Sequence, residues 1–207
     1  LNLFIILFLI VGALCGGIAG AFFALTHDLP QIRALEHFKP DAVTRIYSAD
    51  RVLLAELFVE KREPVPLKTI PRHLIAALVA TEDRKFYKHS GVDLRGIARA
   101  IIKDIKAGEF VEGASTITQQ LAKNLYLSTD KSIIRKIKEI LIARRLENRL
   151  TKNRIFDLYL NIIEFGPGIF GVQAATQYFF NKNVNQLSLE EMVRLTAVIP
   201  KPLKETP

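Results

Sequence analysis

Tryptophan is missing from this chain of 207 residues, and cysteine and methionine occur once each. Because Cys15 is the only cysteine, the chain has no internal disulfide. The four histidines show no metal-ligand spacing, and the sequence has no glycine-rich loop of the phosphate-cradling type. The sequence therefore argues against a disulfide-stapled scaffold, a histidine-bound metal centre and a P-loop nucleotide-binding protein.

Charged side chains are missing from residues 1–26, although the whole chain has a formal net charge of +8. Residues 1–25 are almost wholly apolar, and Asn2 is the only clearly polar residue among them. A helix of this length, rising roughly 1.5 Å per residue, exceeds the roughly 30 Å hydrocarbon thickness of a bilayer. A cleaved signal peptide has a shorter apolar core and small residues at its cut site. We therefore expect residues 1–26 to form a retained transmembrane anchor.

The rest of the chain divides into a juxtamembrane linker, residues 27–64, and a main domain, residues 65–207. Within the linker, residues 43–47 and 53–59 have the pattern of two strands around a polar turn, which predicts a short β-hairpin. Helical patterns dominate the main domain. We therefore expect a mainly α fold with a small β element.

Helix start and stop signals follow one another along the main domain. Residues 155–163 are densely apolar, which predicts a buried helix. Glycine and proline then predict a turn over residues 164–171. The predicted helices have their caps or first turns at Pro71, Asp93, Ser115, Asp130, Thr151, Gly171 and Ser188.

Two carboxylates, Glu82 and Asp83, close the first of these helices. Acidic side chains near a helix C-terminus oppose the helix dipole, at a cost of up to about 1 kcal/mol, so their presence favours a functional role. His89 follows shortly afterwards, and a structural hydrogen bond would be its ordinary role. Farther along, four polar side chains share one face of a predicted helix: Thr116, Gln119, Gln120 and Lys123. A solvated surface would explain this polar stripe as well as a binding face would.

Another carboxylate, Glu139, lies in a strongly cationic segment. Lys131, Arg135 and Glu139 follow one another at a spacing of four residues on one helix face. An intrahelical ion pair between Arg135 and Glu139, worth roughly 0.2–0.5 kcal/mol, would explain part of this pattern. Residues 131–154, however, contain nine Lys or Arg against two Glu. This excess indicates an anionic partner, which could be a phospholipid surface, a phosphate-bearing substrate or nucleic acid.

Five segments resemble, in order, the signature motifs of the peptidoglycan glycosyltransferases (glycosyltransferase family 51). The resemblance covers roughly residues 65–202, and the second motif matches at every fixed position. Asp157, Phe180, Arg194 and Thr196 depart from the family pattern, in parts that we expect to be structural. The matching residues are Glu82-Asp83-x-x-Phe86-x-x-His89-x-Gly91; Gly113-x-Ser115-Thr116-Ile117-Thr118-Gln119-Gln120-Leu121-x-Lys123-Asn124; Arg135-Lys136-x-x-Glu139; Tyr159-Leu160-Asn161 with Gly166-x-Gly168-x-x-Gly171 and Ala174-Ala175; and Leu187-Ser188 with Glu191, Leu195 and Pro200.

The resemblance implies a lysozyme-like, mainly helical fold with a larger lobe and a smaller, membrane-contacting lobe. It implies that Glu82 is the catalytic base and that Glu139 is the second catalytic carboxylate. Lys123, Lys131 and Arg135 would contact the pyrophosphate of the donor. No side chain is expected to bind a metal directly, but a divalent cation, Mg or Mn, could share the charge of this pyrophosphate. The residues expected to bind substrate are Asp83, Phe86, His89, Ser115, Thr116, Gln119, Gln120, Lys123, Asn124, Lys131 and Arg135.

The implied substrates are lipid II, a disaccharide-pentapeptide on undecaprenyl pyrophosphate, and the growing lipid-linked glycan chain. In the implied reaction the acceptor 4-hydroxyl attacks the donor, inverts its anomeric centre and releases undecaprenyl pyrophosphate. Membrane lipids and other cell-wall synthesis or division proteins are implied partners, and nucleic acid is not. The implied location is the bacterial inner (cytoplasmic) membrane, crossed once, with the catalytic domain on the outer (periplasmic) face.

Apolar side chains flank the polar stripe, and we expect them to dip into the membrane interface. These are Phe110, Val111, Leu125, Tyr126 and Leu127.

Two other functions stay open on the sequence alone. A lysozyme-like peptidoglycan hydrolase or lytic transglycosylase also relies on a carboxylate in a helical cleft. The basic helix would also fit a membrane-tethered nucleic-acid-binding protein. Within the family, residues 43–66 resemble the lead-in of bifunctional class A penicillin-binding proteins, whereas residues 197–202 resemble the monofunctional transglycosylases.

Overall fold

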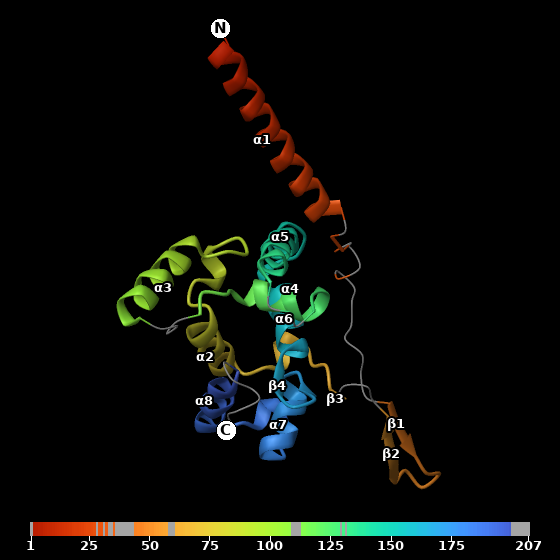
Figure 1. The fold of residues 1–207 in the computed structure, drawn as a ribbon. Coiled ribbons are helices and arrows are strands. Elements are labelled where there is room, and N and C mark those ends of the chain that lie inside the picture. The colour runs from red at the N-terminus through yellow and green to blue at the C-terminus, as the bar shows by residue number, and fades with distance from the viewer. Residues whose placement is uncertain are drawn as a thin grey trace.

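Helices build most of the protein (Figure 1). The computed structural model describes residues 2–27, 29–30, 32, 35, 44–57, 61–108, 113–128, 130 and 132–199. The α-helices are α1 (Asn2–His27), α2 (Arg72–Glu82), α3 (Leu94–Ala107), α4 (Ile117–Tyr126), α5 (Ile133–Arg149), α6 (Lys152–Ile162), α7 (Val172–Phe180) and α8 (Leu189–Val198). Short 3-10 helices are η2 (Leu67–Thr69), η3 (Phe86–Lys88) and η4 (Val184–Gln186). The mainly α fold class expected from the sequence is confirmed.

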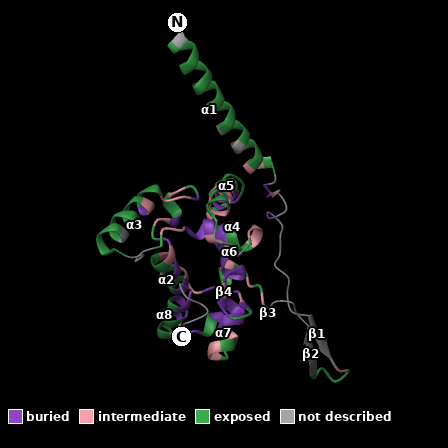
Figure 2. Ribbon diagram, viewed as in Figure 1, coloured by how far each residue is buried: buried purple, intermediate pink, exposed green. Residues whose placement is uncertain are grey.

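The hydrophobic core surrounds α6, and Figure 2 shows buried residues concentrated along α4, α6 and α7. Helix α6 contacts α4, α5 and α7, and α2 packs against α8. Seven of the eleven residues of α6 are buried, as its apolar sequence predicts. The largest fully buried side chains include Tyr159, Phe86, Phe156 and Phe165. Helix α6 is thus the buried element that joins α4, α5 and α7 in the core.

Two helices begin slightly later than the sequence predicts. Helix α4 begins after Thr116 rather than Ser115, because Thr116 Oγ1 accepts the backbone N–H of Gln119 and Gln119 Oε1 accepts the N–H of Thr116. This reciprocal pair is a capping box. Helix α5 begins after Ser132 rather than Asp130, since Ser132 Oγ accepts a backbone N–H in the first turn.

The predicted β-hairpin is present, with β1 (Thr44–Tyr47) antiparallel to β2 (Leu53–Leu57). Ser48 Oγ accepts the backbone N–H of Val52 at 3.0 Å, which closes the turn. Arg51 has φ 64°, in the left-handed region that tight hairpin turns require.

A second sheet of three strands is present that the sequence does not predict. Its order is β3 (Lys61–Arg62), β5 (Ile169–Phe170) and β4 (Glu164–Gly166). Strand β5 pairs in parallel with β3 and antiparallel with β4. Each strand has only two or three residues, too few for an alternating pattern to appear in the sequence. Residues 164–171, predicted to form a simple turn, therefore also form the strands β4 and β5.

The start of the main domain is fixed to α6 by side-chain hydrogen bonds. Asn161 Oδ1 accepts the backbone N–H of Val65 at 2.8 Å, and Asn161 Nδ2 donates to the Val65 carbonyl oxygen at 2.9 Å. One turn earlier, Asp157 Oδ1 accepts the backbone N–H of Leu67 at 2.9 Å. Asp157, one of the departures from the family pattern, thus has a structural role.

Apolar residues that follow α1 lie in the same core. Leu29, Ile32 and Leu35 are buried and belong to the cluster formed by the main-domain helices. Arg154 Nη2, on α6, donates to the carbonyl oxygen of Leu35 at 3.1 Å. The described part of the connection after α1 is therefore packed against the main domain.

Helix α1 projects from the main domain and contacts it at α5 (Figure 1). Its large apolar side chains are exposed, including Leu3, Phe8 and Leu14. Across the described residues, no helix combines the length and the hydropathy needed to cross a membrane. The transmembrane helix predicted for residues 1–26 is not confirmed by the structure.

Candidate active site

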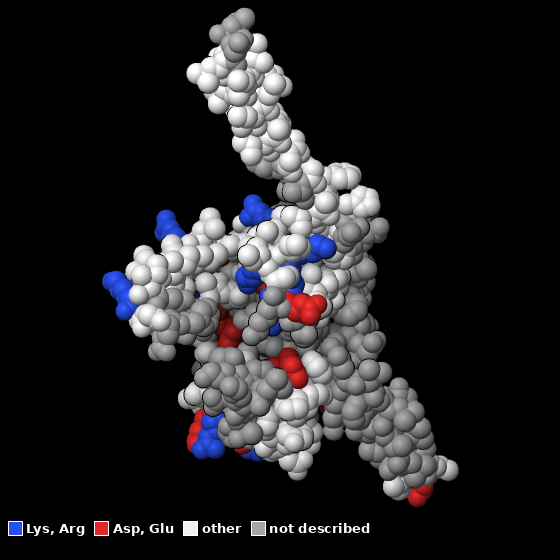
Figure 3. Space-filling model, viewed as in Figure 1, with Lys and Arg blue, Asp and Glu red and all other residues white. Residues whose placement is uncertain are grey.

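A cleft of about 1080 Å³ opens between α2, α3, α4 and α5. Figure 3 shows charged side chains of both signs near the middle of the viewed face, where these helices meet. The fold brings nine of the thirteen predicted site residues into the cleft lining: Glu82, Asp83, Ser115, Thr116, Gln120, Lys123, Asn124, Arg135 and Glu139. Segments that are far apart in the sequence therefore form one site.

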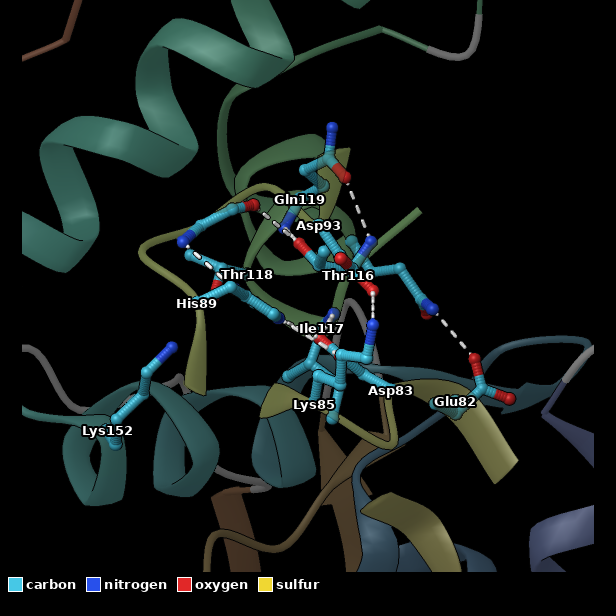
Figure 4. Close-up of polar contacts among 12 residues, drawn as sticks. Glu82, Asp83, Lys85, His89, Asp93, Thr116, Ile117, Thr118, Gln119 and Lys152 are labelled. Atoms are coloured by element: carbon cyan, nitrogen blue, oxygen red, sulfur yellow. Dashed lines mark hydrogen bonds and ion pairs between the residues drawn. The ribbon is translucent and has the colours of Figure 1, made fainter. Parts of the chain in front are cut away.

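Glu82, the last residue of α2, points into the cleft with its carboxylate partly buried. Gln120 Nε2, on α4, donates to Glu82 Oε2 at 2.7 Å (Figure 4). Burial raises the pKa of Glu82; the bond from Gln120 opposes this rise, and the negative charge of Asp83 adds to it. A carboxylate with a raised pKa accepts a proton more readily, which suits a general base.

Asp83, the next residue, has its carboxylate oxygens bound on the other side. They accept the backbone N–H of Ile117 at 3.1 Å and a bond from His89 Nε2 at 2.8 Å (Figure 4). His89 Nδ1 accepts the N–H of Gly91 at 3.1 Å, which assigns the proton of a neutral imidazole to Nε2. Because Ile117 is the first residue of α4, the Asp83 carboxylate also meets the positive end of that helix dipole. Asp83 therefore ties the segment after α2 to the start of α4.

Gly91 is held where a side chain would not fit. Its φ of +94° lies in the region that favours glycine, and a Cβ atom there would lie 3.0 Å from the backbone oxygen of Ala143. Thr116 Oγ1 donates to the Gly91 carbonyl oxygen at 2.7 Å. Thr116 thus caps α4 and also holds the loop that carries His89.

Glu139, on α5, is only 2% exposed and is surrounded by donors. Arg135 Nη1 donates to Glu139 Oε2 at 2.9 Å, which confirms the ion pair considered from the sequence. Lys136 Nζ binds the other carboxylate oxygen and donates to Ser115 Oγ at 2.8 Å. Glu139 therefore holds two cations in the wall of the cleft.

Lys136 is a cleft residue that the sequence reasoning did not select. Its signal was its position three residues before Glu139, which places both on one helix face. Lys131, which the sequence did select, lies outside the described residues. Lys123 and Asn124 are exposed in the cleft, and neither side chain forms a hydrogen bond or ion pair with any residue that the structure describes.

The lining as a whole has more positive than negative side chains. It contains seven Lys or Arg and five Asp or Glu. The positive side chains are Arg84, Lys85, Arg99, Lys103, Lys123, Arg135 and Lys136. Such a lining favours an anionic ligand.

Three predicted site residues do not line the cleft. Phe86 is fully buried, packs on Phe156 and lies under Lys152 Nζ, which is 4.4 Å from its ring centre. His89 is bound to Asp83, and Gln119 is buried in the cap of α4. The four residues of the polar stripe predicted on α4 therefore have two different roles. Thr116 and Gln119 cap the helix, whereas Gln120 and Lys123 face the cleft.

The described residues offer no group of three or more His, Cys, Asp or Glu side chains that could hold a metal ion. Both oxygens of Glu139 are already bound to Arg135 and Lys136. Glu139 is therefore not free to act as a metal ligand.

The chain matches known proteins over most of its length. A family model described as Transglycosylase matches residues 50–207. Penicillin-binding protein 1A of Aquifex aeolicus is 43% identical over 198 residues, which are 96% of this chain and 27% of that protein. Penicillin-binding protein 1A of Escherichia coli is 43% identical over 203 residues, or 96% of this chain and 24% of that protein. Penicillin-binding protein 1F of Bacillus subtilis is 46% identical over 154 residues, or 74% and 22%.

These relatives are much longer than the chain, which spans about a quarter of their length. The matched region nevertheless includes all five of the motifs found in the sequence and every residue described in the cleft. The chain belongs to the transglycosylase family, glycosyltransferase family 51.

Proposed function

We propose that the chain is a peptidoglycan glycosyltransferase that polymerises lipid II into β-1,4-linked glycan strands. The observation that carries the proposal is a partly buried carboxylate in the same cleft as a set of fixed cations. Glu82 is the proposed base, and Glu139 is the proposed second carboxylate that holds Arg135 and Lys136. Family membership supports the same reaction.

The proposed role of Glu82 follows from the weakness of an alcohol as a nucleophile. The 4-hydroxyl of the acceptor sugar attacks the anomeric carbon of the donor, and Glu82 takes its proton as the new bond forms. The bond between the anomeric carbon and the pyrophosphate oxygen breaks in the same step. A single displacement inverts the anomeric centre, so an α-linked donor gives a β linkage.

The leaving group in this reaction is undecaprenyl pyrophosphate, which departs with its negative charge. It needs stabilisation by fixed positive charge more than it needs a proton. We propose that Lys123, Arg135 and Lys136 supply this charge, and that Glu139 keeps two of them in place before the substrate arrives. Lys131 remains a proposed contact. The proposed substrate cleft is further shaped by Asp83, Ser115, Thr116, Gln120 and Asn124.

A peptidoglycan hydrolase is the second candidate, because a buried acid with a raised pKa is also what glycosidases use to protonate a leaving sugar. Such an enzyme has a neutral leaving group and gains nothing from aligned cations. The cationic lining of the cleft therefore favours the transferase.

Incubation of the full chain with lipid II in detergent tests the proposal. We expect glycan strands, with one undecaprenyl pyrophosphate released for each bond formed, measured by gel separation and lipid analysis. The same protein incubated with purified cell wall is expected to release no soluble muropeptides. Soluble muropeptides without polymer would replace the transferase proposal with the hydrolase.

We further propose that residues 1–26 anchor the chain in the bacterial inner membrane, that residues 27–64 are a linker, and that residues 65–207 form a lysozyme-like catalytic domain on the outer face. The exposed apolar side chains of α1 support an anchor. Lipid-linked substrates would meet such a protein at the membrane surface. Other cell-wall synthesis or division proteins remain proposed partners.

Helix α3 has a composition that fits a lipid surface. Four of its large apolar side chains are exposed: Leu94, Ile101, Ile102 and Ile105. Basic residues on the same helix suit anionic headgroups. By contrast, Leu125, Tyr126 and Leu127, which the sequence suggested for this role, are partly buried and pack against the core. Phe110 and Val111 lie outside the described residues.

Because the chain has no tryptophan, one introduced tryptophan reports on a single site. In full chain reconstituted with vesicles of anionic phospholipid, we expect the fluorescence of Ile105→Trp to be quenched by brominated lipid. The matched control is Leu189→Trp, at a position exposed on α8. Equal quenching at both positions, or none at position 105, would contradict membrane contact through α3.

A further inference from the structure

Tyr159, at the centre of the core, is linked to the candidate base through one intervening side chain. Its ring is 1% exposed, and its hydroxyl donates to Gln120 Oε1 at 3.2 Å. Gln120 Nε2 in turn donates to Glu82 Oε2 at 2.7 Å. Three helices, α6, α4 and α2, thus contribute one residue each to a continuous hydrogen-bonded row.

The direction of the Gln120 amide decides which form of Glu82 is stabilised. An amide nitrogen donates to an ionised carboxylate, whereas an amide oxygen in the same place would favour the protonated acid. Nothing in Gln120 itself selects one end, because the amide can turn over. The group on the far side of the amide can fix which end faces Glu82 whether or not Glu82 is ionised.

The group on the far side of the Gln120 amide is the Tyr159 hydroxyl. Gln120 Oε1 is its only hydrogen-bond acceptor among the described residues. If the amide turned over, the buried hydroxyl hydrogen would lose this acceptor, which is unfavourable in the core. Burial also raises the pKa of Tyr159 far above its usual value, so the phenol keeps its hydrogen at every working pH.

We propose that Tyr159 is a positioning residue that holds the amide nitrogen of Gln120 toward Glu82 and thereby keeps the base ionised. The proposal rests on the role proposed above for Glu82. Tyr159 belongs to the fourth motif and lies behind the cleft rather than in its lining.

Several charged groups line the same cleft as Glu82. They are Asp83, Arg84 and Lys85, which follow it in the chain, Asp93, Arg99 and Lys103 from α3 and its cap, Lys123 from α4, Arg135, Lys136 and Glu139 from α5, and Glu164 from β4. Replacing one uncharged ring by another changes none of these charges. A shift caused by Tyr159→Phe would therefore be due to the hydrogen-bonded row.

The test is the pH dependence of lipid II polymerisation by the full chain. In Tyr159→Phe the amide is free to turn over, so Glu82 binds its proton more tightly and the acid limb of kcat/KM moves to higher pH. We expect a shift of about 0.5–1 pH unit, the size that one hydrogen bond supports. Tyr87→Phe is the matched control, because Tyr87 is exposed and its hydroxyl has no hydrogen-bond partner in the described part of the chain. Its acid limb should stay in place.

A double-mutant cycle separates positioning from general loss of packing. Gln120→Leu should also move the acid limb to higher pH, and Tyr159→Phe should add no further shift in that background. An unchanged limb in Tyr159→Phe, or an additive shift in the double variant, would overturn the proposal. If Tyr159→Phe does not fold, an unchanged limb in Gln120→Leu overturns it equally.

A readout without turnover keeps this inference separate from the function. The carboxyl carbon of Glu82, assigned by comparison with Glu82→Gln, can be titrated by NMR in labelled protein. If the pKa of Glu82 is higher in Tyr159→Phe than in the parent, the positioning role is supported even if lipid II is not polymerised. If the pKa of Glu82 is unchanged in a variant that polymerises lipid II, the positioning role is wrong and the proposed function stands.

Discussion

Glu82→Gln is expected to lower lipid II polymerisation by at least about 100-fold, the usual contribution of a general base. The amide has the shape of the carboxylate but cannot take the proton of the acceptor hydroxyl. Its oxygen can still accept the hydrogen bond from Gln120 Nε2, so the fold is expected to persist. The measurement is the initial rate of glycan synthesis at saturating lipid II.

Thermal unfolding supplies the control for Glu82→Gln. Burial raises the pKa of Glu82, so the parent loses stability as the pH rises from the unfolded pKa, about 4.5, through the folded pKa. The amide variant does not ionise, and it should therefore unfold at a higher temperature than the parent at pH 7 but not below pH 4. Glu190→Gln, on the exposed face of α8, should polymerise like the parent. Near-parent synthesis by Glu82→Gln would remove Glu82 as the base.

Asp83→Ala is expected to destabilise the main domain strongly. The substitution leaves the N–H of Ile117 and the Nε2–H of His89 without their acceptor, both in surroundings that are largely closed to water. Each such group costs roughly 1–3 kcal/mol, so we expect the free energy of unfolding to fall by about 3 kcal/mol. For a domain of this size Tm should fall by on the order of 10 °C, measured by calorimetry.

Asp83→Asn is the milder variant. With the amide oxygen at the Oδ2 position, it can still accept both the Ile117 N–H and the 2.8 Å bond from His89 Nε2. Only the contact of His89 Nε2 with Oδ1, at 3.0 Å, is lost, so less than half of the loss should remain. A Tm of Asp83→Ala within a degree or two of the parent would contradict the structural role given to this carboxylate.

Helix positions were predictable where local signals were unambiguous. The caps at Thr151 and Ser188 are confirmed, since each side chain accepts a backbone N–H in the first turn. The start of α4 was placed one residue early because Ser115 and Thr116 are both good caps. Only Thr116 has a glutamine three residues later to complete a capping box.

The small sheet could not be predicted for a different reason. Its strands have two or three residues, and β3 pairs with β5, which lies far from it along the chain. Pairing of this kind is decided by the packed fold around it, which leaves no local pattern to detect.

The motifs placed most of the candidate site correctly in one cleft but could not say which way each side chain points. Glu82 and Asp83 are neighbours in the sequence, yet one faces Gln120 and the other is bound by the start of α4. Phe86 occupies a motif position because it fills the core. Tyr159 carried no sign of its link to the site, since Gln120 lies 39 residues away along the chain.

The burial of Leu29, Ile32 and Leu35 has a mechanical consequence. If the chain between a membrane helix and its domain were unpacked, the distance between that domain and the bilayer surface could vary freely. Here the described part of the connection is held to the main domain by packed side chains and by the hydrogen bond from Arg154 on α6 to Leu35. If α1 lies in a bilayer, this packing would fix the distance between the cleft and the bilayer surface. The sugars of a lipid-linked substrate would then react at a fixed distance from that surface.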